Sequence, residues 1–188
     1  MQKLLSFFLI WRNLFSFVLY MTHKEIIDKD MARYDGETPF EKIGFLRLNF
    51  LLLFIKPFRS VFYYRLKDIR IIPRLNHIFI KPIPAIELDG KIGPGLKVFH
   101  NMGCVIYPDT IGSNCSIGHM VTIGEGKKNA EGRANPIIGD NVWISTGAII
   151  FGGITVGNNV QVGAGCILNK DVPDNCTVVG NPARIIRH

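Results

Sequence analysis

The chain has few cysteines, and they show no pattern of a known site. The four are Cys104, Cys115, Cys166 and Cys176, and their spacings contain neither a C-x-x-C pair nor a zinc-finger arrangement. These spacings argue against a metal site and against a disulfide framework. We predict small buried thiols in a reducing compartment.

Long uninterrupted apolar runs are also absent. Residues 4–20 are rich in Leu, Phe and Ile, but Arg12 and Asn13 interrupt them, and residues 45–55 form a shorter run. A spanning helix needs about 20 apolar residues in succession, which neither stretch supplies. No small-residue cleavage site follows the first stretch, so we expect no signal peptide and a cytoplasmic protein. Both stretches are predicted to be helices that bury one face against protein, with peripheral membrane contact as the alternative.

Acidic residues are outnumbered, which bears on the partner. The 188 residues carry a formal net charge of +7, and 47% of them are hydrophobic. A basic chain suits a polyanion such as nucleic acid, a phosphorylated cofactor or an anionic membrane surface. No fingerprint of a nucleic-acid-binding family is present, so no nucleic-acid partner is predicted.

Glycine is scarce in one part of the chain and frequent in the other. Only Gly36 and Gly44 precede residue 80, where helical runs are expected at residues 24–34, 41–55 and 58–66. The other 17 of the 19 glycines come later, and Pro82 and Pro84 mark the change. We predict a helical N-terminal region at residues 1–80 and a second domain at residues 81–188.

The second domain repeats every six residues. One ladder of large aliphatic residues runs Ile138, Ile144, Ile150, Val156, Val162 and Leu168. A second ladder, four positions later, runs Val142, Ala148, Ile154, Val160, Cys166 and Val172. An earlier part repeats as Ile86, Ile92 and Val98, and then as Ile111, Ile117 and Ile123. A period of six fits neither an α-helix nor an exposed strand, but it fits a triangular parallel β-solenoid, in which each hexapeptide forms a short strand and a corner.

Two irregular steps interrupt the period. Thirteen residues separate Val98 from Ile111, which predicts one inserted residue near Cys104 and Val105. Fifteen separate Ile123 from Ile138, which predicts a loop extruded at residues 125–136. Insertions in repeat proteins commonly lie on the binding face.

Two histidines have equivalent positions in the repeat. Three hexapeptides complete one coil, so residues about eighteen apart stack, or nineteen apart across the inserted residue. By this count His100 lies beneath His119, just before the loop. The alternative is that both are ordinary wall residues facing solvent.

The period, the loop and the ending VGNPARII (residues 179–186) resemble the hexapeptide-repeat acetyltransferases. The serine acetyltransferase-like enzymes, including those that O-acetylate polysaccharides, are the most similar branch, and FRSVFYYRL (residues 58–66) looks like their helical region. The resemblance implies a mainly β fold, a left-handed parallel β-helix with helices before it, assembled as a homotrimer.

The resemblance also implies a mechanism. In this family a histidine at the position of His100 is the general base, which takes the proton from an acceptor hydroxyl as the oxygen attacks the thioester of acetyl-CoA. No covalent enzyme intermediate is needed, so no nucleophilic cysteine is assigned.

Departures from the serine enzymes guide the choice of acceptor. Phe99 stands where those enzymes have an aspartate, and Asn135 where they have a second histidine. Glu87 or Asp89 would have to serve as the acidic partner of His100. The pattern HMVTIG, which begins at His119, looks like the polysaccharide-modifying branch, where His119 would orient His100, bind the sugar or share the proton. We therefore predict a carbohydrate O-acetyltransferase acting on a capsular, exopolysaccharide or O-antigen sugar.

Acetyl-CoA in this family lies in the groove between two prisms. By resemblance its arm would pass small residues, and its phosphates would meet cations. The positions that match are Gly124, Gly126, Thr146 and Ala164 for the arm, and Lys127, Lys128, Lys170 and Arg184 for the phosphates. The alternative is that these are corner glycines and solvated lysines.

Three other functions are weighed against this one. A serine O-acetyltransferase of cysteine biosynthesis would share the fold. A γ-carbonic anhydrase would need three histidine ligands for zinc, and only His100 and His119 lie in the coils, so no metal is predicted. A non-catalytic β-helix scaffold is the third alternative, because the fold alone does not exclude it.

Overall fold

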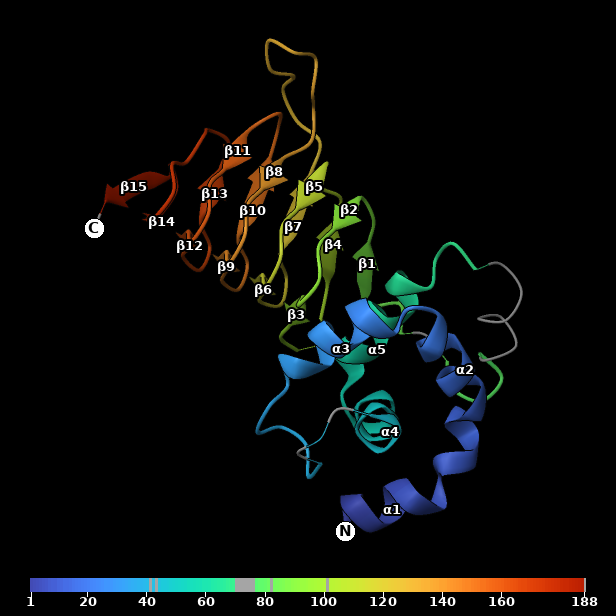
Figure 1. Cartoon of the computed structure of the whole chain (residues 1–188). Coiled ribbons are helices and arrows are strands. Elements are labelled where there is room, and N and C mark those ends of the chain that lie inside the picture. Colours follow the sequence, from blue (N-terminus) through green and yellow to red (C-terminus); the bar gives the residue numbers. More distant parts are fainter. Residues whose placement is uncertain (41, 43, 70–76, 82, 101, 188) are drawn as a thin grey trace. The chain divides into compact units, whose positions relative to one another are not determined.

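The computed structural model describes residues 1–40, 42, 44–69, 77–81, 83–100 and 102–187 (Figure 1). The chain divides into two units, Met1–Pro84 and Ala85–His188, each with its own internal packing. Pro82 lies outside the described residues.

The first unit is helical. Its elements are α1 (Gln2–Phe8), the 3-10 helix η1 (Ile10–Asn13), α2 (Leu14–Thr22), α3 (Lys24–Ala32), α4 (Phe45–Phe54) and α5 (Lys56–Arg65). The core comes from α2 to α5 and the turns beside them: Leu19, Tyr20, Ile27, Met31, Tyr34, Leu48, Leu51, Leu52, Phe58, Phe62 and Leu66. These apolar side chains, removed from water, stabilise the unit.

The helix expected at residues 41–55 is shorter than predicted. It begins at Phe45, directly after Gly44, while residues 41 and 43 lie outside the described part. Glycine is a poor helix former because its backbone loses the most freedom on folding, and here it caps α4 instead of joining it. The apolar run buries more than the one face predicted, because every residue from Arg47 to Leu52 is buried.

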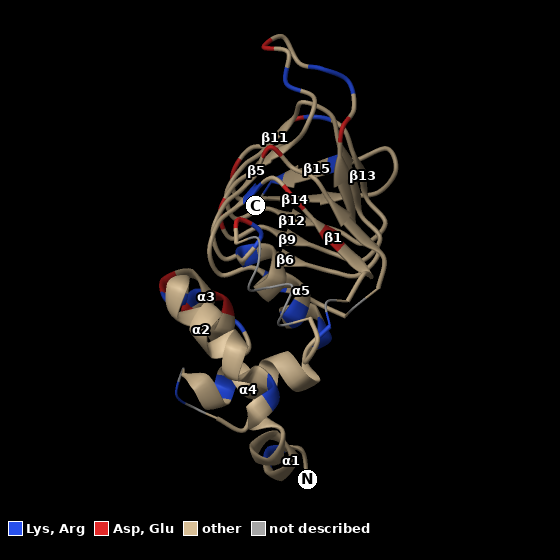
Figure 2. Cartoon of the chain, turned by 90° about the vertical axis from the view of Figure 1, so that its right-hand side faces the viewer, with Lys and Arg blue, Asp and Glu red and all other residues tan. Residues whose placement is uncertain are grey.

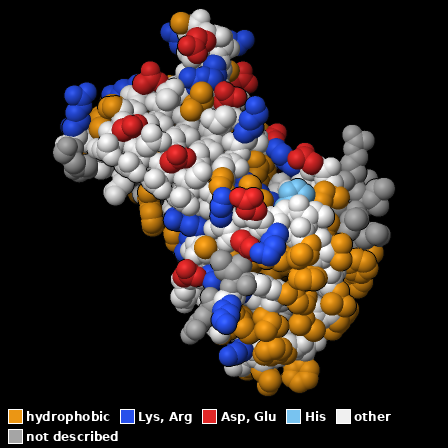
Figure 3. Space-filling model, in the orientation of Figure 1, with side chains coloured by type: hydrophobic (Ala, Val, Ile, Leu, Met, Phe, Trp, Pro, Cys, Tyr) orange, Lys and Arg blue, Asp and Glu red, His pale blue; other side chains and the backbone are white. Residues whose placement is uncertain are grey.

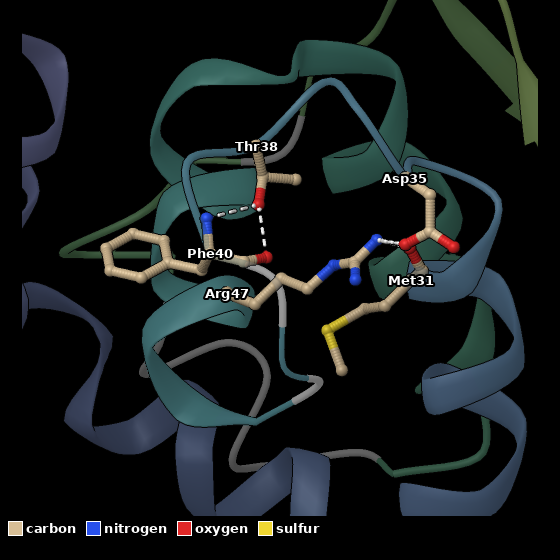
Figure 4. A network of polar contacts seen from close by, with 5 residues as sticks. All are labelled: Met31, Asp35, Thr38, Phe40 and Arg47. Carbon is tan, nitrogen blue, oxygen red and sulfur yellow. Dashed lines mark hydrogen bonds and ion pairs between the residues drawn. The ribbon is translucent and has the colours of Figure 1, made fainter.

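Buried charged groups pair inside the helical unit. Asp30 and Arg65 are almost fully buried and meet in a bidentate pair, with Arg65 Nε 2.7 Å from Asp30 Oδ2 and Nη2 3.0 Å from Oδ1. Arg47, also buried, donates to the carbonyl of Met31 and to Asp35 Oδ1, which ties α4 to the end of α3 (Figure 4). Removing one partner of a buried pair such as Asp30–Arg65 is strongly destabilising, because it leaves an uncompensated buried charge.

The N-terminal apolar stretch breaks into three short helices. Among the described residues no single helix is long and apolar enough to cross a bilayer. Gln2–Phe8 and Ile10–Thr22 satisfy the length and composition only when taken together, and they are bent by 67°.

The second unit is a parallel β-solenoid, as predicted. Its strands are β1 (Ile86–Leu88), β2 (Lys91–Ile92), β3 (Lys97–Val98), β4 (Cys104–Ile106), β5 (Thr110–Ile111), β6 (Ser116–Ile117), β7 (Thr122–Gly124), β8 (Ile137–Ile138), β9 (Trp143–Ile144), β10 (Ile149–Phe151), β11 (Thr155–Val156), β12 (Gln161–Val162), β13 (Ile167–Leu168), β14 (Cys176–Val179) and β15 (Arg184–Arg187).

Three sheets form the walls of the prism. The strand orders are β1-β4-β7-β10-β13, β2-β5-β8-β11 and β3-β6-β9-β12-β14-β15. All pairs are parallel except the final β14–β15 hairpin. The upper coils pair residues eighteen apart, such as Ile138 with Val156 and Ile144 with Val162.

The two predicted ladders line the interior. Ile138, Ile144, Ile150, Val156, Val162 and Leu168 are all buried, as are the smaller residues of the second ladder. Asparagines with positive φ turn several corners, and their amides bond from coil to coil, Asn141 to Asn159 and Asn159 to Asn175. The hexapeptide period therefore reports the inward side chains correctly.

The inserted residue is placed differently from the prediction. The inward ladder passes through buried Ile106, which pairs with Ile123 and lies eight residues after Val98 and five before Ile111. The corner between Val98 and Ile106 is thus two residues longer than a regular step of six, and the next corner is one residue shorter. A single insertion near Cys104 and Val105 was wrong in detail, because the two changes partly cancel in the count.

Candidate functional site

The lengthened corner carries His100. The strand before it ends at Val98, which pairs with Ile117 in the coil above at the predicted interval of nineteen. His100 has a φ of 58° and is exposed, while residue 101 lies outside the described part. Histidine, like asparagine and aspartate, adopts positive φ more often than other residues with a side chain, and Met120 and Asn141 have the same conformation at other corners.

His100 and His119 lie together, as the stacking count predicted. Their ring centroids are 5.2 Å apart and the rings meet edge to face at 83°. The Nδ1 atom of His119 lies 3.3 Å from Thr146 Oγ1 in the next coil. Gly118 permits this close stacking, because a Cβ there would come 2.6 Å from the backbone nitrogen of Thr146. The corner thus presents two imidazoles, and the one of His119 lies within hydrogen-bond distance of the Thr146 hydroxyl.

Phe99 faces a different set of neighbours. Its ring centroid lies 5.2 Å from that of Trp143, and Lys97 Nζ lies 4.8 Å from its centre. These contacts give Phe99 a packing role on the wall of the six-stranded sheet.

The carboxylates proposed as acidic partners of His100 lie on and just after β1. Both Glu87 and Asp89 are exposed. Glu87 Oε2 accepts a hydrogen bond of 3.1 Å from Tyr107 Oη, and this bond raises the pKa of the Tyr107 phenol. The structure thus gives Glu87 a partner other than His100. An acidic partner for His100 stays a prediction.

The loop at residues 125–136 leaves the prism between β7 and β8, as Figures 1 and 2 show. Across it the pairing interval grows to 27, as in Ile111 with Ile138. Arg133 fastens the loop, because its guanidinium donates to the carbonyls of Asn135 and Ile154 and to Thr155 Oγ1. Arg133 was not predicted, although the basic composition of the loop could have signalled it.

Asn135 stands at the base of the same loop. Its Oδ1 atom is buried and has no hydrogen-bond partner within the described residues. A buried acceptor without a partner is costly, so it suits a group that receives a donor from a ligand or a neighbouring chain. A role for Asn135 in acceptor binding stays a prediction.

Three of the four predicted cations line one hollow beside the loop. The hollow measures about 350 Å³ and is lined by Lys127, Lys128, Asn129, Phe151, Gly152, Gly153, Ile154, Asn169, Lys170 and Asp171. It lies at the corner that follows β10 and β13. Lysine amines around a pocket with backbone edges suit the phosphates of a nucleotide. Arg184 begins β15 on the six-stranded sheet and is not among the lining residues.

The small residues predicted along the cofactor arm fall into two places. Thr146 and Ala164 continue the His119 corner upward, since the amide of Gly147 bonds to the carbonyl of His119, and that of Gly165 to Thr146. Gly124 ends β7 opposite Phe151, and Gly126 approaches Gly152, where a Cβ would come 2.7 Å from the backbone nitrogen. The five-stranded sheet separates the histidine corner from the lysine hollow.

The metal-ligating and thiol side chains that the structure describes can be placed as follows. Within the described residues no three His, Cys, Asp or Glu side chains come together as metal ligands would. All four cysteines are free and buried. Burial raises the pKa of the Cys104 and Cys166 thiols, which keeps them in the unreactive thiol form.

Sequence relatives of the chain are serine acetyltransferases. That of Synechococcus elongatus is 38% identical over 119 residues, covering 62% of this chain and 48% of that protein. That of Bacillus pumilus is 39% identical over 126 residues, covering 62% of this chain and 53% of that protein. The chain therefore spans about half the length of the curated relatives it matches. No protein-family model matches it.

Solved structures that resemble this chain are also serine acetyltransferases. The crystal structure of Neisseria gonorrhoeae serine acetyltransferase in complex with serine superimposes with a TM-score of 0.62 at 28% identity, covering 89% of this chain and 71% of that chain. The chain has the serine acetyltransferase fold. The predicted left-handed β-helix preceded by helices is confirmed.

The same comparisons contradict the predicted acceptor. The relatives act on serine by name, so the carbohydrate assignment was wrong and the alternative, a serine O-acetyltransferase, is the better supported one. The error came from giving Phe99 and Asn135 more weight than the resemblance of the whole domain. Phe99, which stands where the serine enzymes have an aspartate, packs against the ring of Trp143.

Proposed function

We propose that this chain transfers the acetyl group of acetyl-CoA to the hydroxyl of L-serine, with His100 as the general base. The observation that carries the proposal is the pairing of His100 with His119 at a lengthened corner of a serine acetyltransferase fold. The serine-bound relative supports the choice of acceptor.

The reaction needs one proton acceptor and no covalent enzyme intermediate. The serine hydroxyl oxygen attacks the thioester carbonyl carbon, and the imidazole of His100 takes the hydroxyl proton. A tetrahedral intermediate forms and collapses, the carbon–sulfur bond breaks, and the CoA thiolate leaves. The imidazolium returns the proton to the thiolate, so free CoA and O-acetylserine are produced and His100 is regenerated.

His119 and Thr146 are assigned positioning roles. The ring of His119 packs edge to face on His100, and Thr146 Oγ1 lies within hydrogen-bond distance of His119 Nδ1. A hydrogen bond on one imidazole nitrogen fixes the ring orientation and decides which nitrogen carries the proton. This arrangement would hold His100 in the orientation that proton transfer requires.

Acetyl-CoA is assigned to the path between the lysine hollow and the histidine corner. Lys127, Lys128 and Lys170 would bind its phosphates, and the five-stranded sheet would lie beneath its arm. The exposed apolar wall of that sheet, with Val105 and Ile149 in register on either side of Thr122, supports assembly with further copies. We assign a homotrimer, in which each groove lies between two copies.

Replacing two lysines of the hollow tests the cofactor path. For Lys127→Ala/Lys170→Ala we expect the KM for acetyl-CoA to rise about tenfold, which corresponds to about 1.4 kcal/mol, with kcat little changed. Added salt should raise the wild-type KM more than that of the variant, because ions screen exposed charges. Lys91→Ala in β2, outside the hollow, is the matched control, and an equal rise in KM there would count against the assignment.

The proposed activity is tested by the release of free CoA. The full chain is incubated with acetyl-CoA and either L-serine or L-alanine, which lacks only the hydroxyl, and thiol is followed with a colorimetric reagent. We expect release that depends on L-serine and saturates with its concentration. Equal release with the two amino acids would refute serine as the acceptor.

A further inference from the structure

The N-terminal helices expose a large apolar surface. Phe8 is 70% exposed, Leu4 65%, Trp11 and Leu14 55% each, and Val18 54%. In Figure 3 hydrophobic side chains cover a broad part of the helical unit. A contiguous apolar surface of this kind on a folded unit normally marks a binding site.

The buried side of α1, η1 and the first turn of α2 is polar, whereas Leu19 and Tyr20 at the end of α2 belong to the apolar core. Asn13 Nδ2 donates to Asn49 Oδ1 at 2.7 Å, Asn49 Nδ2 donates to the carbonyl of Ser6, and Ser16 bonds to Asn13. These four side chains are almost completely buried. The network fixes the rotation of the helices, because turning the apolar face inward would leave buried amides without partners.

This arrangement reverses the one expected in water. A helix on a water-facing surface buries its apolar stripe and exposes its polar residues. A helix in contact with lipid does the opposite, since hydrocarbon solvates apolar side chains and polar groups pair with neighbouring helices. The residues of α1, η1 and the first turn of α2 follow the second pattern.

The net positive charge of the chain lies in the same unit. Residues 1–84 contain 14 Lys and Arg against seven Asp and Glu, a formal charge of +7, whereas residues 85–188 contain eight of each. A basic unit with an apolar face is complementary to a membrane surface that contains anionic lipids.

A basic hollow lies beside α1. It measures about 530 Å³ and is lined by Lys3, Pro39, Phe40, Lys42, Gly44, Phe45 and Leu46. Lys3 Nζ lies 5.7 Å from the centre of the Phe40 ring. Two amines beside apolar and aromatic side chains suit the phosphate and upper acyl chain of a lipid.

The geometry favours lying in the membrane surface over crossing it. Helices of seven and thirteen residues rise about 10 and 20 Å, against a hydrocarbon core of about 30 Å. The bend of 67° between them shortens their joint reach further. We propose that the outer face of α1, η1 and α2 inserts into the interfacial region of an anionic lipid bilayer and docks the enzyme there.

Vesicle binding of the full chain tests the proposal. Sedimentation is measured with phosphatidylcholine vesicles and with vesicles containing 30% phosphatidylglycerol. We expect binding to the anionic vesicles, weaker binding to the neutral ones, and weakening of the anionic binding by salt. In a Trp143→Phe background, where Trp11 is the one remaining tryptophan, its emission should shift to the blue on binding.

Two variants distinguish binding through the apolar face of α1, η1 and α2 from non-specific hydrophobic adsorption. Leu4→Ser/Phe8→Ser/Val18→Ser should lower binding at least about tenfold, because each removes an inserting side chain. The matched control is Val179→Ser/Ile186→Ser, which removes exposed apolar groups from β14 and β15 and should bind as the wild type does. Thermal unfolding confirms that both variants fold.

Three results would overturn the proposal. They are wild-type protein that stays in the supernatant with anionic vesicles, equal binding by the triple-serine variant, and an unshifted Trp11 emission. Sedimentation velocity tests whether a second copy of the chain, instead of lipid, covers this face. Self-association that the triple-serine variant loses, without vesicle binding, would assign the face to a second copy and refute lipid docking.

Discussion

His100→Ala is expected to lower kcat for acetyl transfer by about 10²–10⁴-fold, the usual contribution of a general base. The KM for acetyl-CoA should change little, because the lysine hollow lies at another corner of the prism. Steady-state rates of CoA release, measured over a full range of acetyl-CoA and acceptor concentrations, separate the two parameters.

The control is His23→Ala, which removes a partly exposed imidazole in the helical unit, where its contact is the neighbouring Thr22 hydroxyl. This variant should retain wild-type kcat. Thermal unfolding of both variants shows whether the loss is chemical. Retention of more than about a tenth of kcat by folded His100→Ala would remove His100 from the role of base.

Asp30→Ala is expected to lower the free energy of unfolding by about 3–5 kcal/mol. The substitution leaves the guanidinium of Arg65 buried without the carboxylate that it meets at 2.7 Å and 3.0 Å. Denaturant unfolding followed by circular dichroism measures the change. Glu25→Ala, whose carboxylate is 90% exposed and pairs with Lys29 one turn away, should cost less than about 0.5 kcal/mol.

A double replacement separates the pair from its burial. Asp30→Leu/Arg65→Met removes both charges and keeps apolar volume, so it should recover most of the stability lost in Asp30→Ala. If the double variant is as unstable as the single one, the loss comes from packing or from other hydrogen bonds of these residues, and the account of an unpaired buried cation is wrong.

The solenoid could be predicted from the sequence because its rule is local. Each inward side chain recurs after six residues, so Val98, Ile117 and the residues two places beyond them could be stacked by counting alone. The same count brought His100 beneath His119, which the structure shows as a ring contact. It misplaced the insertion because two changes in corner length partly cancel, and Ile106 entered the ladder unnoticed.

The packing of the helical unit could not be predicted from the sequence, because its contacts join residues far apart in the chain. Nothing near Asn13 indicates that it bonds to Asn49, and this bond decides which face of the N-terminal helices is buried. In the solenoid, the basic composition of the loop could have signalled Arg133, but not its bond to the Ile154 carbonyl in the next coil. The acceptor was predicted wrongly because Phe99 and Asn135 were given more weight than the resemblance of the whole domain to serine acetyltransferases.

The most direct test of the account is to identify the product. Acetyl-CoA labelled with ¹³C at the carbonyl is incubated with the full chain and L-serine, and the mixture is followed by NMR. The account predicts a new ester carbonyl signal coupled to the serine β protons, which forms at least about a hundredfold more slowly with His100→Ala. A label that stays on the thioester, or appears only as free acetate, would contradict it.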